Sequence, residues 1–219
     1  GRSMFGSLEP VEEVTAGRTI SAPQVMNAFG AIVTAAGGNA VIREGMAANL
    51  GKRARGSYWL RTKVVDIRKA NDLRTGAHEV AHNLEAVGYG ESNPWVKGGA
   101  AKLSEAQQVE LFQLGKELYG DTEPNGGYLR EGWAEFMTYV LTQDGTVKAP
   151  EMMRWMQEEF LPANPDVADA IRKAQDHARV WRMQGSGARA RESVVGAQTR
   201  TGRAGQATRE ALSRQGRER

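Results

Sequence analysis

The chain has 219 residues, of which 40% are hydrophobic, and a formal net charge of +3 at neutral pH. A chain of this length can bury one good hydrophobic core but is too short for two full domains. Cysteine is absent, which excludes disulfide bonds and cysteine zinc ligands, so any metal ion must be bound by histidine and carboxylate side chains.

The positive charge is concentrated in the last part of the chain. Residues 185–219 contain eight arginines and three glutamates, a net charge of +5, which leaves about −2 for the preceding residues. We interpret residues 185–219 as a basic, disordered tail or linker, and a weak contact between its arginines and a polyanion is the alternative. Residues 1–19 lack the apolar segment of a signal peptide and are interpreted as a flexible lead-in. The folded domain is therefore expected to span residues 20–184.

An uncharged segment over residues 20–42 is the first candidate element. It consists mostly of alanine, glycine, threonine and asparagine, which are too small and too polar for a membrane span. We predict a soluble helix over residues 23–36, with Ser21 as the N-cap and Pro23 in the first turn.

Residues 57–68 are rich in tyrosine, tryptophan, valine and isoleucine, which is typical of β structure. We predict two strands, over residues 57–60 and 63–68, that form a hairpin or a small sheet. Because side chains alternate along a strand, Val65 and Ile67 are expected to face the opposite side from Val64 and Asp66.

The next helix, predicted over residues 73–87, carries the motif His78-Glu79-Val80-Ala81-His82. Residues four apart lie on one face of a helix, so His78 and His82 can direct two imidazoles at one metal ion. Glu79 lies about a quarter turn away and reaches a metal-bound water more easily than the metal itself. The alternative interpretation is a pair of solvated histidines beside a surface glutamate.

Two histidines leave a metal ion without a third ligand, and Glu131 is the candidate for that position. It lies with Glu135 on a helix predicted over residues 129–141, and the spacing of four places both on one face. Glu135 is expected to accept a hydrogen bond from the free ring nitrogen of a metal-binding histidine, with a solvated side chain as the alternative. Gly132 is expected to let this helix pack closely against the helix of His78.

The segments around these two motifs predict loops and further helices. Residues 88–103 are rich in glycine, proline and asparagine, and this loop is long enough to form part of a cleft wall. Ser104 is a candidate N-cap. Further helices are expected over residues 105–119, 150–160 and 166–183.

The sequence His78-Glu79-x-x-His82, followed by Leu129-Arg130-Glu131-Gly132-Trp133-Ala134-Glu135-Phe136, resembles the gluzincin metallopeptidases. In the aminopeptidase N-type members a Leu-x-Glu-Gly-x-Ala stretch carries the glutamate ligand. The resemblance therefore implies that Glu131 completes a Zn²⁺ site with His78 and His82. It also implies an α+β fold, a mainly helical zincin-like domain with a small β-sheet or hairpin before the helix of the first motif. The wider layout is similar to metallopeptidase-like domains within large phage polyvalent proteins.

The resemblance also implies the chemistry, which is zinc-dependent peptide-bond hydrolysis of a peptide or protein substrate. Zinc lowers the pKa of a bound water toward about 7, and Glu79 acts as the general base. In gluzincins the strand ahead of the zinc helix lies along the substrate cleft. Residues 63–68 therefore either pair with an extended peptide or form a core strand without a ligand.

A donor for the transition-state oxyanion is expected as well, and the sequence does not choose among three candidates. A packing or surface role is the alternative for each of them. They are Tyr128, Tyr139 and His177.

Two other functions compete with hydrolysis. The chain could be a catalytically weak or inactive metal-binding or structural module of a larger phage-like polyprotein, or a nucleic-acid partner that binds through residues 185–219. The chain lacks a Gly-x-Met-Glu-Asn-like stretch, which argues against aminopeptidase activity. The absence of cysteine and of a signal peptide favours a cytoplasmic or virion-associated location, with no membrane contact.

Overall fold

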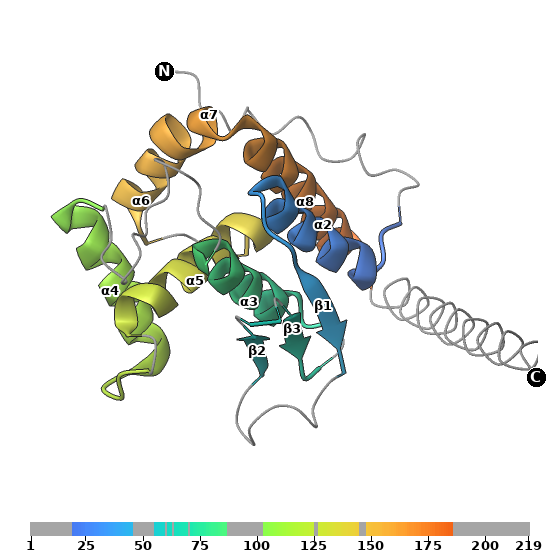
Figure 1. The fold of residues 1–219 in the computed structure, drawn as a ribbon, viewed down its shortest axis with the longest axis horizontal. Coiled ribbons are helices and arrows are strands. Elements are labelled where there is room, and N and C mark those ends of the chain that lie inside the picture. Colours follow the sequence, from blue (N-terminus) through green and yellow to red (C-terminus); the bar gives the residue numbers. More distant parts are fainter. Residues whose placement is uncertain are drawn as a thin grey trace, which may run out of the picture.

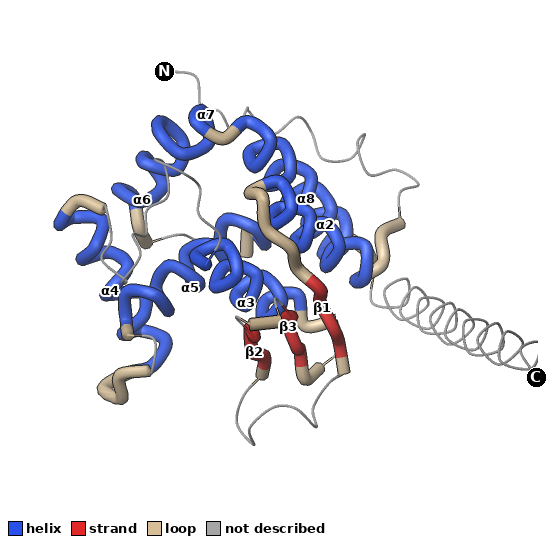
Figure 2. The backbone as a smooth tube through the Cα atoms, viewed as in Figure 1, coloured by secondary structure: helices blue, strands red, loops and turns tan. Residues whose placement is uncertain are grey.

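A computed structural model describes residues 19–45, 55–59, 61–62, 64–69, 71–86, 103–124, 127–144 and 148–185. The predicted lead-in at residues 1–19, the loop at 88–103 and the tail at 185–219 lie almost entirely outside these ranges. Within them the fold is α+β and mainly helical, with a small sheet on one side (Figure 1, Figure 2). The predicted fold class is confirmed.

Three short strands form the sheet in the order β1-β3-β2 (Figure 2). The central strand β3 is parallel to β1 and antiparallel to β2, so both of its edges are paired. Of its two predicted roles, the core strand is therefore correct, and pairing of this strand with an extended peptide is wrong. Strand β1 was not predicted, because its partner is distant in sequence and its residues are only half-buried. The strands are β1 Val41–Glu44, β2 Gly56–Trp59 and β3 Val64–Ile67.

The two faces of β3 are buried in different ways. Val65 and Ile67 are fully buried in the hydrophobic core, as their alternation predicts. Asp66 points to the other face and is also buried, because Arg43 of β1 donates hydrogen bonds of 2.7 and 2.8 Å to its carboxylate. The Trp59 indole of β2 donates a third hydrogen bond at 2.9 Å. One buried carboxylate thus links all three strands.

The helices begin where the sequence places their caps. Ser21 and Ser104 each form a capping box with the glutamine three residues later. Asp72 precedes α3, and its carboxylate accepts a hydrogen bond from the Thr75 N–H at 3.1 Å. The helices are α2 Ala22–Ala35, α3 Leu73–Ala86, α4 Glu105–Tyr119, α5 Tyr128–Thr142, α6 Pro150–Trp155, α7 Leu161–Ala163 and α8 Pro165–Met183, and a π-helical segment, η3 Met156–Phe160, joins α6 to α7.

Helices α3 and α5 form the centre of the molecule (Figure 1). Helix α3 contacts α5 and α2 as well as strands β2 and β3. Trp133 of α5 is fully buried, and its indole N–H donates a hydrogen bond of 3.2 Å to the carbonyl of Ala81 in α3. This bond fixes the position of α5 along α3, and with it the relative positions of the two sequence motifs.

Helices α4 and α5 approach each other through glycines. Gly115 of α4 lies against the backbone of Tyr128, and Gly132 of α5 lies against the backbone of Leu111, so neither position has room for a side chain. The predicted partner of Gly132 is therefore wrong, since this glycine packs α5 against α4 and not against the helix of the histidines. Successive helical residues point about 100° apart, so a residue next to Glu131 cannot share its direction.

Helices α2 and α8 lie side by side and complete the core (Figure 1). Helix α8 is tied to α5 by Gln175, whose amide donates a hydrogen bond of 2.8 Å to the carbonyl of Val140. Among the helices of the described ranges, none is long and apolar enough to cross a membrane.

Candidate metal centre

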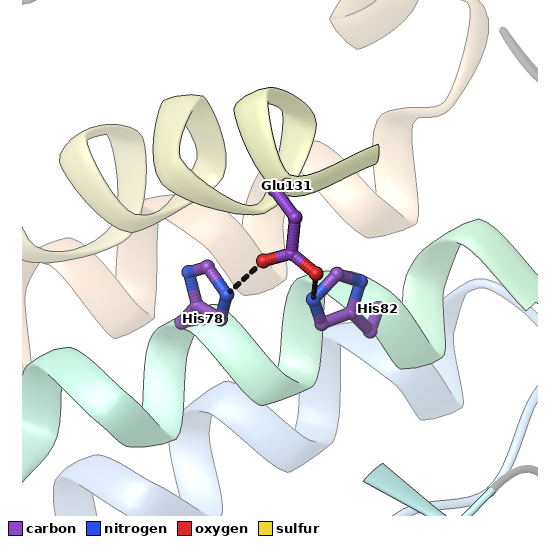
Figure 3. Close-up of side chains that lie close together, drawn as sticks. All are labelled: His78, His82 and Glu131. Atoms are coloured by element: carbon purple, nitrogen blue, oxygen red, sulfur yellow. Dashed lines mark hydrogen bonds and ion pairs between the residues drawn. The ribbon is translucent and has the colours of Figure 1, made fainter. Parts of the chain in front are cut away.

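Three side chains from α3 and α5 converge at one point (Figure 3). His78 and His82 lie one turn apart on α3, and Glu131 projects toward both of them from the first turn of α5. The Nε2 atom of His78 lies 3.1 Å from one carboxylate oxygen of Glu131, and the Nε2 atom of His82 lies 3.6 Å from the other. The two motifs, far apart in sequence, therefore meet at a single site.

This cluster has the donors and the spacing to hold a metal ion. The potential ligand atoms of His78, His82 and Glu131 all lie within 4.8 Å of one another, so one ion can reach all three. Two imidazole nitrogens and a carboxylate oxygen leave at least one coordination position for water, as in hydrolytic metal sites. All three side chains are at least half-buried, which shields such an ion from bulk solvent.

Contacts at the site shift the pKa values of Glu131 and His82. Burial opposes ionisation of Glu131, but a hydrogen bond from His78 and the close approach of His82 outweigh it and hold the pKa of Glu131 well below its usual range. Burial likewise opposes protonation of His82, yet Glu131 and Glu85 raise the pKa of His82 to about 9. Without a metal ion, a protonated His82 thus balances the carboxylate, and a cation at the site would take over that role.

Glu79 lies against strand β2 beside the histidines. Its side chain is only 9% exposed, and burial, the main cause, raises the pKa of its carboxyl group. The backbone N–H of Tyr58 donates a hydrogen bond to that carboxylate. Gly56 makes room for it, since a Cβ atom at this position would lie 2.9 Å from Glu79 Oε1. A raised pKa makes a carboxylate a better proton acceptor.

Tyr119 reaches the site from the end of α4, and sequence reasoning missed it. Its hydroxyl donates a hydrogen bond of 2.9 Å to Glu131 Oε2. Burial and the nearby carboxylate raise its pKa, so the phenol stays protonated and remains a donor. The only sequence signal is its place just before the helix-ending Gly120, and the crossing of α4 over α5 is needed to bring it to the site.

The three predicted oxyanion donors have other surroundings. The Tyr128 hydroxyl donates a hydrogen bond of 2.8 Å to the carbonyl of Gly120, which fits its predicted packing alternative. Tyr139 lies beside the guanidinium of Arg74, whose central carbon is 5.2 Å from the ring centroid. His177 lies on α8, and its Nδ1 atom is buried without a hydrogen-bond partner among the described residues.

Glu135 lies behind His78, one turn after Glu131 on α5. Its Oε2 atom is 3.9 Å from His78 Nδ1, the ring nitrogen that faces away from Glu131. Its other oxygen forms an ion pair with Arg74 of α3. Glu135 is thus placed toward the ring nitrogen that the prediction requires, just beyond hydrogen-bond distance, and it is buried rather than solvated.

Comparisons of the chain with protein-family models, curated proteins and solved structures give no match. The resemblance to gluzincins therefore rests on the two motifs alone.

Proposed function

We propose that the protein is a zinc-dependent metallopeptidase that hydrolyses peptide bonds. The observation that carries this proposal is the meeting of Glu131 with both Nε2 atoms of the motif His78-Glu79-x-x-His82. Two histidines and a glutamate with an open position form a donor set used by zinc hydrolases. The side chains of His78 and His82 are only 15% and 18% exposed, which does not fit a pair of solvated surface histidines.

In this proposal His78, His82 and Glu131 hold the ion through their near nitrogen and oxygen atoms. A bound zinc ion supplies an acidified water as the nucleophile and polarises the scissile carbonyl. Glu79 removes the proton from the attacking water and passes it to the departing amine. Its raised pKa, caused mainly by burial, makes this carboxylate a stronger base than an exposed glutamate.

We assign the oxyanion-stabilising role to Tyr119, in place of Tyr128, Tyr139 and His177. Its hydroxyl is already within hydrogen-bond distance of the Glu131 carboxylate, and its raised pKa keeps the proton on the phenol. A neutral donor held at the edge of the site can turn toward an oxygen that gains negative charge in the transition state.

The substrate in this proposal is an extended peptide that adds to β2. Among the described residues β2 is the edge strand of the sheet, and its Tyr58 backbone contacts Glu79 directly. A peptide that pairs with the edge of β2 therefore runs past the general base. The central strand β3 cannot take this role, because β1 and β2 already occupy its edges.

The test is a peptide-library digest by the zinc-loaded wild-type chain and by Glu79→Gln, with metal content measured in both. We expect about one zinc per chain in each protein, and hydrolysis about 10²–10⁴-fold slower in the variant, the usual contribution of a general base. Glu117→Gln is the matched control, because Glu117 is an exposed α4 glutamate paired with Lys148. Undiminished hydrolysis by Glu79→Gln would defeat the mechanism, and a library left uncut by the zinc-loaded wild type would favour a non-catalytic metal-binding module.

A further inference from the structure

We infer that Glu85 and Arg130 are positioning residues that orient His82 for metal binding. This inference rests on the proposed function only in that His82 is taken as a metal ligand. Glu85 lies one turn after His82 on α3, and Arg130 immediately precedes Glu131 on α5. Neither residue was predicted to act at the site.

The two ring nitrogens of His82 face two different carboxylates. Its Nε2 atom faces Glu131 at 3.6 Å, and its Nδ1 atom lies 3.7 Å from Glu85 Oε2. A metal ion can use only the nitrogen that carries a free lone pair, so the proton of a neutral imidazole has to sit on the other one. Glu85 stands where it would accept that proton's hydrogen bond and so fix the tautomer that presents Nε2 to the metal.

The environment of Glu85 favours this assignment. Its side chain is only 6% exposed, and its Oε2 atom has no hydrogen-bond partner in the described part of the chain. A buried carboxylate oxygen without a partner is costly, so it is expected where a function requires it. A shift of about 1 Å or less would bring Oε2 within ordinary hydrogen-bond distance of His82 Nδ1. The other oxygen is held by an ion pair with Arg130 Nε.

The same arrangement occurs at His78, where Glu135 faces Nδ1 and Arg74 holds Glu135. In both cases the arginine and the glutamate come from opposite helices, so each ion pair also joins α3 to α5. On the side away from Glu131, each histidine thus faces a carboxylate, and an arginine is paired with that carboxylate. This repetition argues against a chance contact at Glu85.

The test compares the full-length wild type with Glu85→Gln in a zinc titration against a competing chelator. We expect the variant to bind zinc about 10–100-fold more weakly, the effect typical of removing a carboxylate behind a metal-binding histidine. The matched control is Glu110→Gln. Glu110 is another partly buried glutamate, whose oxygens accept hydrogen bonds of 3.0 and 2.9 Å from the first N–H groups of α6. Glu110→Gln should lower the melting temperature of the protein and leave its zinc affinity unchanged.

A second readout separates positioning from general structural damage. In the zinc-loaded protein, the imidazole proton on Nδ1 of His82 should give a downfield NMR signal, which Glu85→Gln shifts and Glu110→Gln does not. Arg130→Gln should weaken zinc binding less than Glu85→Gln does. Equal zinc affinity and an unchanged His82 signal in Glu85→Gln would overturn the inference. A wild type that binds zinc but cleaves no peptide would contradict only the proposed function, and one that binds no zinc would overturn both.

Discussion

Helix α5 presents carboxylates to α3 and a glycine to α4. Toward α3, Glu131 and Glu135 face two histidines and an arginine, with little access to solvent. Toward α4, Gly132 lies directly against the backbone of Leu111, with no room for a side chain at that position. At the candidate metal site the α3–α5 interface is therefore polar and paired, whereas α4 and α5 meet through backbone contacts at Gly115 and Gly132, with the ring of Phe112 packed against that of Tyr128.

The difference indicates that the α3–α5 and α4–α5 interfaces have different roles. Buried charges are costly unless they are paired, so the α3–α5 interface is expected where chemistry needs them. Backbone contact leaves little freedom for a helix to shift, so the α4–α5 interface sets the position of α5. Tyr119 links the two interfaces, since it belongs to α4 and its hydroxyl donates a hydrogen bond to Glu131. Changes at the two interfaces should accordingly have separable effects.

The largest expected effect is at the backbone contact. Gly132→Ala places a methyl group against the Leu111 backbone, which cannot move aside without separating α4 from α5. We expect the free energy of unfolding to fall by about 3 kcal/mol, at the upper end of overpacking costs. Chemical denaturation followed by circular dichroism measures this.

Gly30→Ala is the matched control for this prediction, since an added Cβ in α2 meets only ordinary contacts, at 3.9 Å from Ile42 and 4.0 Å from Ala40. This change should stabilise the helix by about 0.5–1 kcal/mol. Equal stability of Gly132→Ala and the wild type would show that α4 and α5 are not held by backbone contact.

The next largest effect is expected at Tyr119, which contributes to both interfaces. Tyr119→Phe removes a donor next to Glu131, and kcat should fall about 100-fold, as for loss of an oxyanion donor. KM should change little, and because the decrease in kcat is measured at saturating zinc, weaker zinc binding through the lost hydrogen bond to Glu131 does not account for it. In Tyr128→Phe, by contrast, the lost hydrogen bond to Gly120 should cost about 1 kcal/mol of stability without affecting kcat. If Tyr128→Phe lowers kcat and Tyr119→Phe does not, the assignment of the two tyrosines is reversed.

The smallest expected effect is the pH dependence of zinc binding at the α3–α5 interface. His82, with a pKa of about 9 in the metal-free protein, has to lose its proton before a metal ion binds. Zinc affinity should therefore rise about tenfold for each pH unit as the pH increases toward that pKa. Calorimetry in buffers of different ionisation enthalpy should detect about one proton released per zinc bound at neutral pH, and His177→Gln should not change that number.

Zinc affinity is expected to rise with pH, whereas the stability of the metal-free protein is expected to fall as the pH rises. The pKa of His82 is raised from its ordinary value of 6.5 to about 9 by folding. Its pairing therefore stabilises the fold fully below pH 6.5, and this contribution is lost as the pH rises through about 9. A metal-free protein that is more stable at pH 9 than at pH 6.5 would contradict the His82–Glu131 pairing.

How much of this structure the sequence predicts depends on the range of the interactions. The helix N-termini capped by Ser21 and Ser104 depend only on residues close in sequence. The same is true of the spacing that places His78 and His82 on one face of a helix. Glu131 was chosen through its motif, and the structure places it beside both histidines.

The remaining features depend on contacts between distant segments. Strand β1 is defined only by its pairing with β3, and the partner of Gly132 depends on which side of α5 faces α4. The positions of Tyr119 and Glu85 depend on the packing of α4, α3 and α5. No local pattern in the sequence contains that information.

The central claim is that His78, His82 and Glu131 bind one zinc ion, and a calorimetric zinc titration of the wild type and Glu131→Ala tests it most directly. We predict one zinc per wild-type chain and a loss of affinity in Glu131→Ala beyond the roughly 100-fold limit typical of residues behind the ligands. Far-UV circular dichroism should show that the variant remains folded. Equal zinc affinity of the two proteins, or no zinc bound by the wild type, would contradict the claim.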